Sequence, residues 1–255
     1  MTKKIEISSI LKNSESLVDI FNFNVNKRPH HKIFFFKKNN NWISNSFIET
    51  KKRIEKIKKH FLNNGIRQGD RVFLLSSNRL EWVEFDLAIM SVGAITVPSF
   101  VTNNQHDNAF IINDCKPKFV VLENDGVYEK NKSFLKLNKS KIITIETSDH
   151  FENYNNILNK TIIIKTKNVI IKKKQISSII YTSGTTGNPK GVVLTHESIM
   201  HNLFGALEIM DEFKLDNERF ISFLPLSHSY ERMAGLYFPI LICAQIYFCS
   251  SMDKL

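Results

Sequence analysis

The chain has 255 residues, of which 42% are hydrophobic and 24% are charged, and its formal net charge is +10. This composition fits a folded globular chain and excludes a collagen-like, a disordered or a polytopic membrane protein. The three cysteines are scattered and form no C-x-x-C pair. That spacing argues against a disulfide framework and a structural zinc site, and it favours a reducing compartment.

The positive charge comes from lysine rather than from arginine. There are 28 lysines and 7 arginines, and the lysines are spread along the chain. Nucleic-acid-binding proteins usually gather arginine-rich charge on one face, so we expect solvated lysines and no nucleic-acid partner. Peripheral contact with an anionic membrane stays open as an alternative. The polar N-terminal segment has no apolar stretch typical of a signal peptide, so we expect a cytoplasmic location, with membrane association left open.

The first predicted elements are a hairpin and an amphipathic helix. Residues 32–37 and 42–47 flank an asparagine-rich turn and predict two antiparallel strands. Across residues 47–64, large apolar side chains recur mostly every third or fourth position, and lysine and arginine occupy the others. This spacing predicts a helix, which Gly65 is placed to end.

From residue 69 onward, short apolar strands alternate with helices. Strands are predicted at residues 71–76, 94–100, 119–123, 141–145, 176–181, 191–194, 220–224 and 244–248, and helices at residues 80–92, 105–114, 197–210 and 231–241. The fold class is therefore α/β, with a parallel sheet flanked by helices and a second sheet that the last two strands only begin. Asn78 is expected to cap the helix at 80–92. Apart from one strand, residues 126–174 are expected to be variable surface.

The apolar run from residue 233 to residue 249 needs an interpretation of its own. Gly235, Pro239 and Gln245 interrupt it, and its length lies at the lower limit for crossing a bilayer. We interpret it as a helix followed by a buried strand. If nothing pairs with that last strand, we expect an open apolar edge there and poor behaviour in solution.

A glycine- and threonine-rich loop joins two apolar strands. Residues 181–191 read Y-T-S-G-T-T-G-N-P-K-G. Glycines let backbone amides approach a ligand, hydroxyl groups add donors, and successive N–H groups form a nest for a phosphate chain. Lys190 is followed by Gly191 and not by Ser or Thr, so the loop is not a Walker A motif. The predicted phosphate-binding residues are Thr182, Ser183, Gly184, Thr185, Thr186, Gly187 and Lys190.

A second motif follows the strand predicted at 220–224. Residues 223–232 read F-L-P-L-S-H-S-Y-E-R, with His228 just beyond the strand end, where ligands gather in parallel sheets. A structural role is the alternative for this histidine. Tyr230 and Glu231 are candidate supporting residues. The alternatives carry equal weight: Glu231 could simply be a charge at a helix start, and Arg232 could be a solvated cation.

The two motifs together resemble those of a known family. The loop resembles the phosphate-binding signature of AMP-forming, acyl-adenylating synthetases, and residues 223–232 resemble the matching segment of long-chain fatty-acyl-CoA synthetases. The resemblance implies the N-terminal subdomain of the acyl-adenylating fold, with fatty acid, ATP and CoA as partners and Mg²⁺ as the metal. It also implies that His228 lies at the acyl and adenylate site. Asn78, Glu81 and Trp82 resemble an early segment of the family that serves packing.

The resemblance also predicts how the chain is organised. Members of the family are longer, so residues 1–255 are expected to form an incomplete AMP-binding domain without the C-terminal domain. Its expected parts are residues 1–64, 65–175 and 176–255. The metal-ligating glutamate of the family would follow Leu255, so no complete Mg²⁺ site is expected. The implied function is the N-terminal part of a fatty acid–CoA ligase, inactive alone, whose missing portion could be encoded separately. A non-catalytic nucleotide- or acyl-binding module and a decayed fragment are the alternatives.

Overall fold

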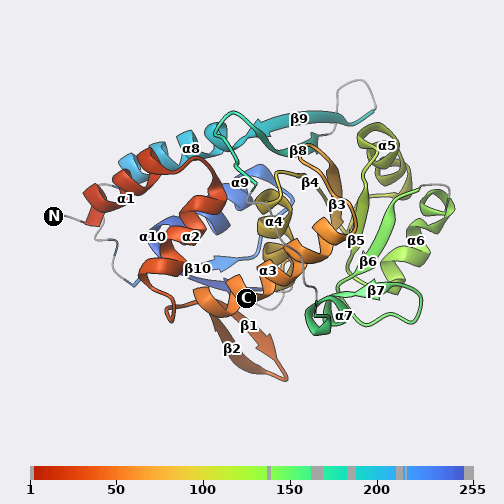
Figure 1. Ribbon diagram of the computed structural model, residues 1–255, viewed down its shortest axis with the longest axis horizontal. Coiled ribbons are helices and arrows are strands. Elements are labelled where there is room, and N and C mark those ends of the chain that lie inside the picture. Colours follow the sequence, from red (N-terminus) through yellow and green to blue (C-terminus); the bar gives the residue numbers. More distant parts are fainter. Residues whose placement is uncertain are drawn as a thin grey trace.

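Two β-sheets with helices packed on them make up the part of the chain that the computed structural model describes (Figure 1). That part comprises residues 3–136, 139–161, 169–182, 188–210, 215 and 217–249. No helix within those ranges has both the length and the apolar character that crossing a membrane would need.

The larger sheet has seven strands in the order β7-β6-β5-β3-β4-β8-β9. Its strands are β3 (Arg71–Leu75), β4 (Ile95–Ser99), β5 (Phe119–Leu122), β6 (Lys141–Thr144), β7 (Glu152–Asn153), β8 (Ile176–Thr182) and β9 (Lys190–Thr195). All neighbours are parallel except β8 and β9, which form an antiparallel hairpin. The predicted parallel α/β sheet is thus confirmed.

Helices cover both faces of this sheet. On one face, side chains such as Phe73 and Val120 pack with α5 (Gln105–Cys115) and α6 (Asp125–Leu135). On the other face, Val72 and Val121 belong to the larger apolar core, which includes α3 (Phe47–Asn63), α4 (Leu80–Ser91) and α7 (Tyr154–Asn159). Alternation of side chains along each strand therefore supplies two separate cores.

The smaller sheet has the strand order β10-β11-β1-β2. The hairpin of β1 (Lys32–Lys38) and β2 (Asn41–Ser46) joins β10 (Arg219–Ser222) and β11 (Gln245–Phe248) through parallel pairing of β1 with β11. The predicted second sheet thus gains two strands from the N-terminal part of the chain. The prediction that the strand at 244–248 has an open edge is wrong, because β11 lies between β1 and β10. Among the described residues, β10 and β2 are the edge strands of this sheet.

Further helices pack beside the smaller sheet. Their order is α1 (Lys3–Asn13), α2 (Leu17–Lys27), α8 (His196–Ile209), α9 (Ser229–Glu231), the π-helix η2 (Arg232–Tyr237) and α10 (Phe238–Ile242). Two long-range contacts hold α2: the Asn24 side chain donates to the Ile240 carbonyl over 2.7 Å, and the Leu17 amide donates to Nδ1 of His196 over 3.3 Å. The N-terminal helices are thus part of the main core, although the sequence analysis did not predict them.

Two local predictions need correction. Arg79, and not Asn78, is the N-cap residue of α4, and its side chain makes no capping hydrogen bond. Residues 126–136 and 139–161 contain more regular secondary structure than expected, and α6 buries Leu135 while α7 buries Ile157. Each of these helices turns few large apolar residues inward, so the lysines and asparagines around them conceal the helical period.

Candidate functional site

The β8–β9 hairpin carries the predicted phosphate loop. Thr182 and Lys190 face each other as the last cross-strand pair, and both are exposed. They form the base of a loop whose residues 183–187, including the predicted Ser183, Gly184, Thr185, Thr186 and Gly187, lie outside the described residues. The structure therefore brings together the first and last of the predicted phosphate-binding residues.

Tyr181 and Gly191 fix the register of this hairpin. They are cross-strand partners, and the Tyr181 hydroxyl donates to Oδ2 of Asp114 on α5. Burial and this carboxylate raise the pKa of Tyr181, so the phenol stays protonated and keeps donating. A Cβ at Gly191 would lie 2.9 Å from Cγ2 of Ile179 and 3.2 Å from Cζ of Tyr181. Only glycine therefore leaves room at this position for the side chains of Ile179 and Tyr181 on the paired strand β8.

His228 lies at the same edge of the larger sheet as the loop. In the parallel pair β4 and β8, Thr96 is opposite Ser178, and Phe100 and Thr182 each follow four residues later. The rings of Phe100 and His228 meet at 4.3 Å between centroids with an interplanar angle of 64°. Phe100 thus connects the histidine to the strand edge from which the phosphate loop emerges. The His228 side chain is exposed and open to a ligand.

Asn78 anchors the segment that carries His228. Its Nδ2 donates to Oγ of Ser222 over 3.1 Å and to the Leu224 carbonyl over 2.6 Å, and its Oδ1 accepts from the Leu226 amide over 2.8 Å. The amide therefore joins the carboxyl end of β3 to the carboxyl end of β10. From the sequence, Asn78 was expected to cap a helix or to serve packing. Its position directly after a buried strand was the available signal for a role at the site.

The two predicted supporting residues differ in exposure. Tyr230 is 66% exposed, whereas Glu231 is buried. The Glu231 carboxyl packs against Gly235, where a Cβ would lie 2.4 Å from Oε1, and it has a hydrogen bond with Ser222. Burial raises the pKa of Glu231. Glu231 therefore does lie in a first helical turn, as the alternative interpretation had it, but its carboxyl is buried there.

Arg232 is buried as well, so its interpretation as a solvated cation is wrong. Its guanidinium pairs with Asp86 on α4, and its Nε lies 2.9 Å from the Tyr237 hydroxyl. Asp86 also accepts from Tyr237 over 2.6 Å and from Thr96 over 2.7 Å. This buried network fixes η2 to α4 and β4. It holds the His228 segment from below, because the Arg232 amide also donates to the His228 carbonyl over 3.0 Å.

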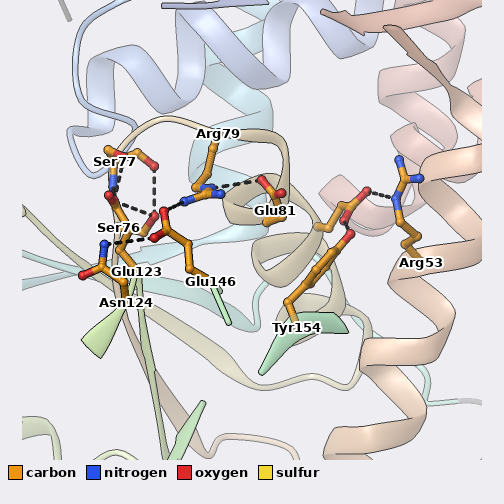
Figure 2. A network of polar contacts seen from close by, with 10 residues as sticks. Arg53, Ser76, Ser77, Arg79, Glu81, Glu123, Asn124, Glu146 and Tyr154 are labelled. Carbon is orange, nitrogen blue, oxygen red and sulfur yellow. Dashed lines mark hydrogen bonds and ion pairs between the residues drawn. The ribbon is translucent and has the colours of Figure 1, made fainter. Parts of the chain in front are cut away.

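A cavity of about 860 Å³ opens between the β1–β2 hairpin and the carboxyl ends of β3, β5 and β6. Figure 2 shows two carboxylates that organise its rim. Glu123 accepts from the backbone and the hydroxyl of Ser77, each over 2.6 Å. Glu146 pairs with Arg79 over 2.9 Å, and Arg79 also pairs with Glu81 over 3.0 Å. One guanidinium thus serves two carboxylates, and Glu123 is held by neutral donors, so this group keeps an excess of negative charge.

Glu84 lies behind this rim and is fully buried. It accepts from Nε of Arg53 over 2.6 Å and from the Tyr154 hydroxyl, as Figure 2 shows for the two labelled partners. Burial raises the pKa of Glu84 to about 7, although the neighbouring Arg53 acts in the opposite direction. The group connects α4 with α3 and α7 and has a structural function.

No metal centre is formed by the residues in the described ranges: nowhere among them do three His, Cys, Asp or Glu side chains gather in a way that could hold an ion. The candidate site therefore consists of the Thr182–Lys190 pair, Phe100, His228 and the anchor Asn78.

Comparisons with known proteins identify the family of the chain. The model of the family described as AMP-binding enzyme matches residues 21–255. Long-chain-fatty-acid–CoA ligase FadD15 of Mycobacterium tuberculosis is 28% identical over 204 residues, which is 76% of this chain and 34% of that protein. Human long-chain-fatty-acid–CoA ligase ACSBG2 is 27% identical over 253 residues, which is 92% of this chain and 37% of that protein.

Solved structures show the same fold. A fatty acyl-adenylate ligase from L. pneumophila, in complex with acyl adenylate and pyrophosphate, has a TM-score of 0.76 at 24% identity over 94% of this chain and 40% of its own. The luciferase-like enzyme of the mealworm Zophobas morio has a TM-score of 0.81 at 17% identity over 94% of this chain and 55% of its own. The chain spans about a third of the length of the curated relatives it matches. It belongs to the AMP-binding enzyme family and resembles the N-terminal part of AMP-forming fatty acid–CoA ligases.

Proposed function

We propose that the chain is the N-terminal part of an ATP-dependent long-chain fatty acid–CoA ligase, and that it does not turn over alone. The observation that carries the proposal is the pairing of Thr182 with Lys190 at the base of the phosphate loop, at the sheet edge where Phe100 contacts His228. A cation at the base of a loop able to form a backbone nest suits a phosphate chain. An exposed histidine beside an aromatic ring suits the carboxylate of a fatty acid bound next to that phosphate chain.

The proposed reaction has two steps. A fatty acid carboxylate attacks the α-phosphorus of ATP, an acyl O–P bond forms, and pyrophosphate leaves. The thiolate of CoA then attacks the acyl carbon, and AMP leaves with the electron pair of the broken C–O bond. In this scheme, the loop from Thr182 to Gly187 and Lys190 bind the β- and γ-phosphates and orient ATP. His228 borders the carboxylate end of the acyl chain.

The share of this reaction that the described residues can perform is positioning. Phosphate transfer depends on donors and cations placed before the charge develops. Lys190 supplies such a cation, and Asn78 and Arg232 hold the His228 segment in place. Mg²⁺ would neutralise phosphate charge in the complete ligase. The described residues gather no set of carboxylates that fits it, so no step is assigned to a metal held by them.

A binding experiment tests the proposal with two probes. One is ATP, and the other is a stable mimic of a long-chain acyl adenylate, which lacks the β- and γ-phosphates. Calorimetry on the 255-residue chain should show that His228→Ala lowers the affinity for the mimic about tenfold, while the affinity for ATP stays the same. His201→Ala, an exposed histidine on α8, is the control and should change neither affinity.

The outcomes separate the proposed function from its alternative. A chain that binds ATP but not the acyl-adenylate mimic is a nucleotide-binding module and contradicts the ligase assignment. One observation favours that alternative: the described residues include the base of the predicted phosphate loop but no cluster of side chains that could hold a metal ion. Fatty-acid-dependent exchange of pyrophosphate into ATP should stay at background. Exchange by this chain would contradict the claim that it does not turn over alone.

A further inference from the structure

We propose that a buried relay of polar side chains positions the imidazole of His228 through the ring of Phe100. The relay runs from α6 through α5 to the turn after β4, and its members are Asn131, Asn108, Ser99 and Asn103. The value of this orientation for an acyl adenylate rests on the proposed function, whereas the orientation itself is measurable without a ligand.

The main chain at His228 is fixed, but polar contacts do not hold its side chain. The His228 amide donates to the Pro225 carbonyl over 2.9 Å, and its carbonyl accepts from the Arg232 amide. The imidazole does not cap α9, and it has no hydrogen bond or ion pair with any residue in the described ranges. Its ring contact is with Phe100, at 4.3 Å between centroids and 64° between planes. The direction in which this exposed ring points therefore depends on where Phe100 lies.

Phe100 follows β4 and begins a turn that the relay holds. The Asn103 amide donates to the Phe100 carbonyl over 3.1 Å, and Asn103 Nδ2 donates to Oγ of Ser99 over 3.1 Å. The Ser99 hydroxyl in turn donates to Oδ1 of Asn108 on α5 over 2.9 Å. The residue before Phe100 and the residue three positions after it are thus tied to each other and to the helix layer.

The relay continues from α5 to α6, which lie on the same face of the larger sheet (Figure 1). Asn108 Nδ2 donates to Oδ1 of Asn131 over 3.1 Å, and Asn131 Nδ2 donates to the Val127 carbonyl over 2.8 Å. Asn108 and Ser99 are each 1% exposed. Burying polar side chains costs free energy that apolar residues of similar size would not cost. A chain of satisfied hydrogen bonds supplies direction in return, because it fixes angles that apolar contacts leave open.

The alternative is that Phe100 forms an apolar wall that contacts the acyl chain directly. In that case leucine, which is also large and apolar, would largely replace it. An aromatic ring that meets an imidazole at a steep angle makes a directional contact that leucine lacks. The ring geometry therefore favours the positioning role, and a variant that removes the ring but keeps an apolar side chain separates the two.

Nuclear magnetic resonance of the 255-residue chain measures the orientation without a ligand. The ring protons of His228 are identified among the eight histidines by their absence in His228→Ala. We expect the ring current of Phe100 to displace them in the wild type, and Phe100→Leu to return them to the position of an exposed histidine. Ser99→Ala, which cuts the relay and keeps both rings, should move them in the same direction. The control Ser91→Ala also removes a buried hydroxyl, which donates to the Ala88 carbonyl over 2.7 Å, and should leave them in place.

Calorimetry with the long-chain acyl-adenylate mimic measures the consequence for the site. Phe100→Leu should lower the affinity for the mimic about threefold to tenfold, and Phe100→Tyr should retain it. In a His228→Ala background, Phe100→Leu should have no further effect, because the ring then has no imidazole to position. Phe151→Leu is the control, because Phe151 meets Tyr128 at 4.6 Å and 63° next to β7. This control should bind the mimic as the wild type does.

Three results would overturn the proposal. They are His228 protons at one position in the wild type and Phe100→Leu, unchanged protons in Ser99→Ala, and equal losses of mimic affinity on Phe100→Leu with and without His228. The last result would make Phe100 a direct contact of the ligand. Failure of the proposed function looks different: the wild type would not bind the mimic, or His228→Ala would bind it equally well. The proton positions would still decide whether the relay holds His228.

Discussion

At the residue scale, the site depends on side chains that join segments far apart in the sequence. Asn78 contacts residues more than 140 positions away, and Arg232 pairs with Asp86. The sequence predicted Lys190 and His228 because their motifs are local. It could not predict the partners of Asn78 or the burial of Glu231 and Arg232, because a polar residue after a strand or at a helix start is compatible with both a solvent-facing and a buried position.

Replacing Asn78 by alanine should reduce stability and loosen the His228 segment. The variant loses three hydrogen bonds and leaves the Leu226 amide without its acceptor. We expect the free energy of unfolding to fall by about 2–3 kcal/mol. Urea denaturation measures it, with Asn202→Ala on the exposed face of α8 as the control. A loss no larger than in the control would mean that Asn78 is not an anchor.

His196 should make the protein less stable in acid. Burial and the nearby Arg232 lower its pKa from 6.5 to about 4, and Nδ1 must stay unprotonated to accept from the Leu17 amide. As the pH falls below 6.5, the unfolded chain takes up a proton that the folded chain excludes, so stability is lost down to about pH 4. Between pH 7 and pH 5 this loss amounts to about 2 kcal/mol.

The test compares the wild type with His196→Asn, whose side-chain oxygen can replace Nδ1 as acceptor. Urea denaturation should show that the wild type loses about 2 kcal/mol more than the variant between these pH values. The subtraction removes the opposite effect of Glu84. The pKa of Glu84 is raised from 4.5 to about 7, so its protonation stabilises the folded protein as the pH falls through this range. Parallel curves for the two proteins would refute the role of His196.

At the element scale, the strands of the larger sheet were predictable because each is a short apolar run between turn residues. The union of the β1–β2 hairpin with β10 and β11 was not, because the pairing of Phe34 with Ile246 is non-local. Helices α6 and α7 escaped prediction because few of their residues are buried. Local pattern thus determined which elements form, and burial by distant segments determined where they lie.

Gly191 tests the hairpin that carries the phosphate loop. In Gly191→Ala, the new Cβ should collide with Ile179 and displace Tyr181. We expect a loss of about 1–3 kcal/mol in the free energy of unfolding and weaker ATP binding. Gly205→Ala is the matched control, because its Cβ meets no atom within 4 Å and alanine favours the helix α8. That variant should be at least as stable as the wild type, and equal stability of both variants would exclude strain at Gly191.

At the scale of the whole molecule, the two sheets bring their strand ends to one place. The carboxyl ends of β3, β4, β8 and β10 contribute Asn78, Phe100, Thr182 and the His228 segment. This convergence follows from parallel topology, so the general position of the site was predictable once the motifs were placed after strands. The exposed edge of β10, with Ile221 54% exposed, is a surface where we expect association in solution.

The central claim is that the β8–β9 hairpin binds the β- and γ-phosphates of ATP next to an acyl-adenylate site. The most direct test is calorimetric titration of Lys190→Ala with ATP and with the acyl-adenylate mimic, using Lys174→Ala as the control. We expect ATP affinity to fall about tenfold to a hundredfold, while affinity for the mimic, which lacks those phosphates, stays unchanged. Equal affinities of wild type and Lys190→Ala for ATP would contradict it.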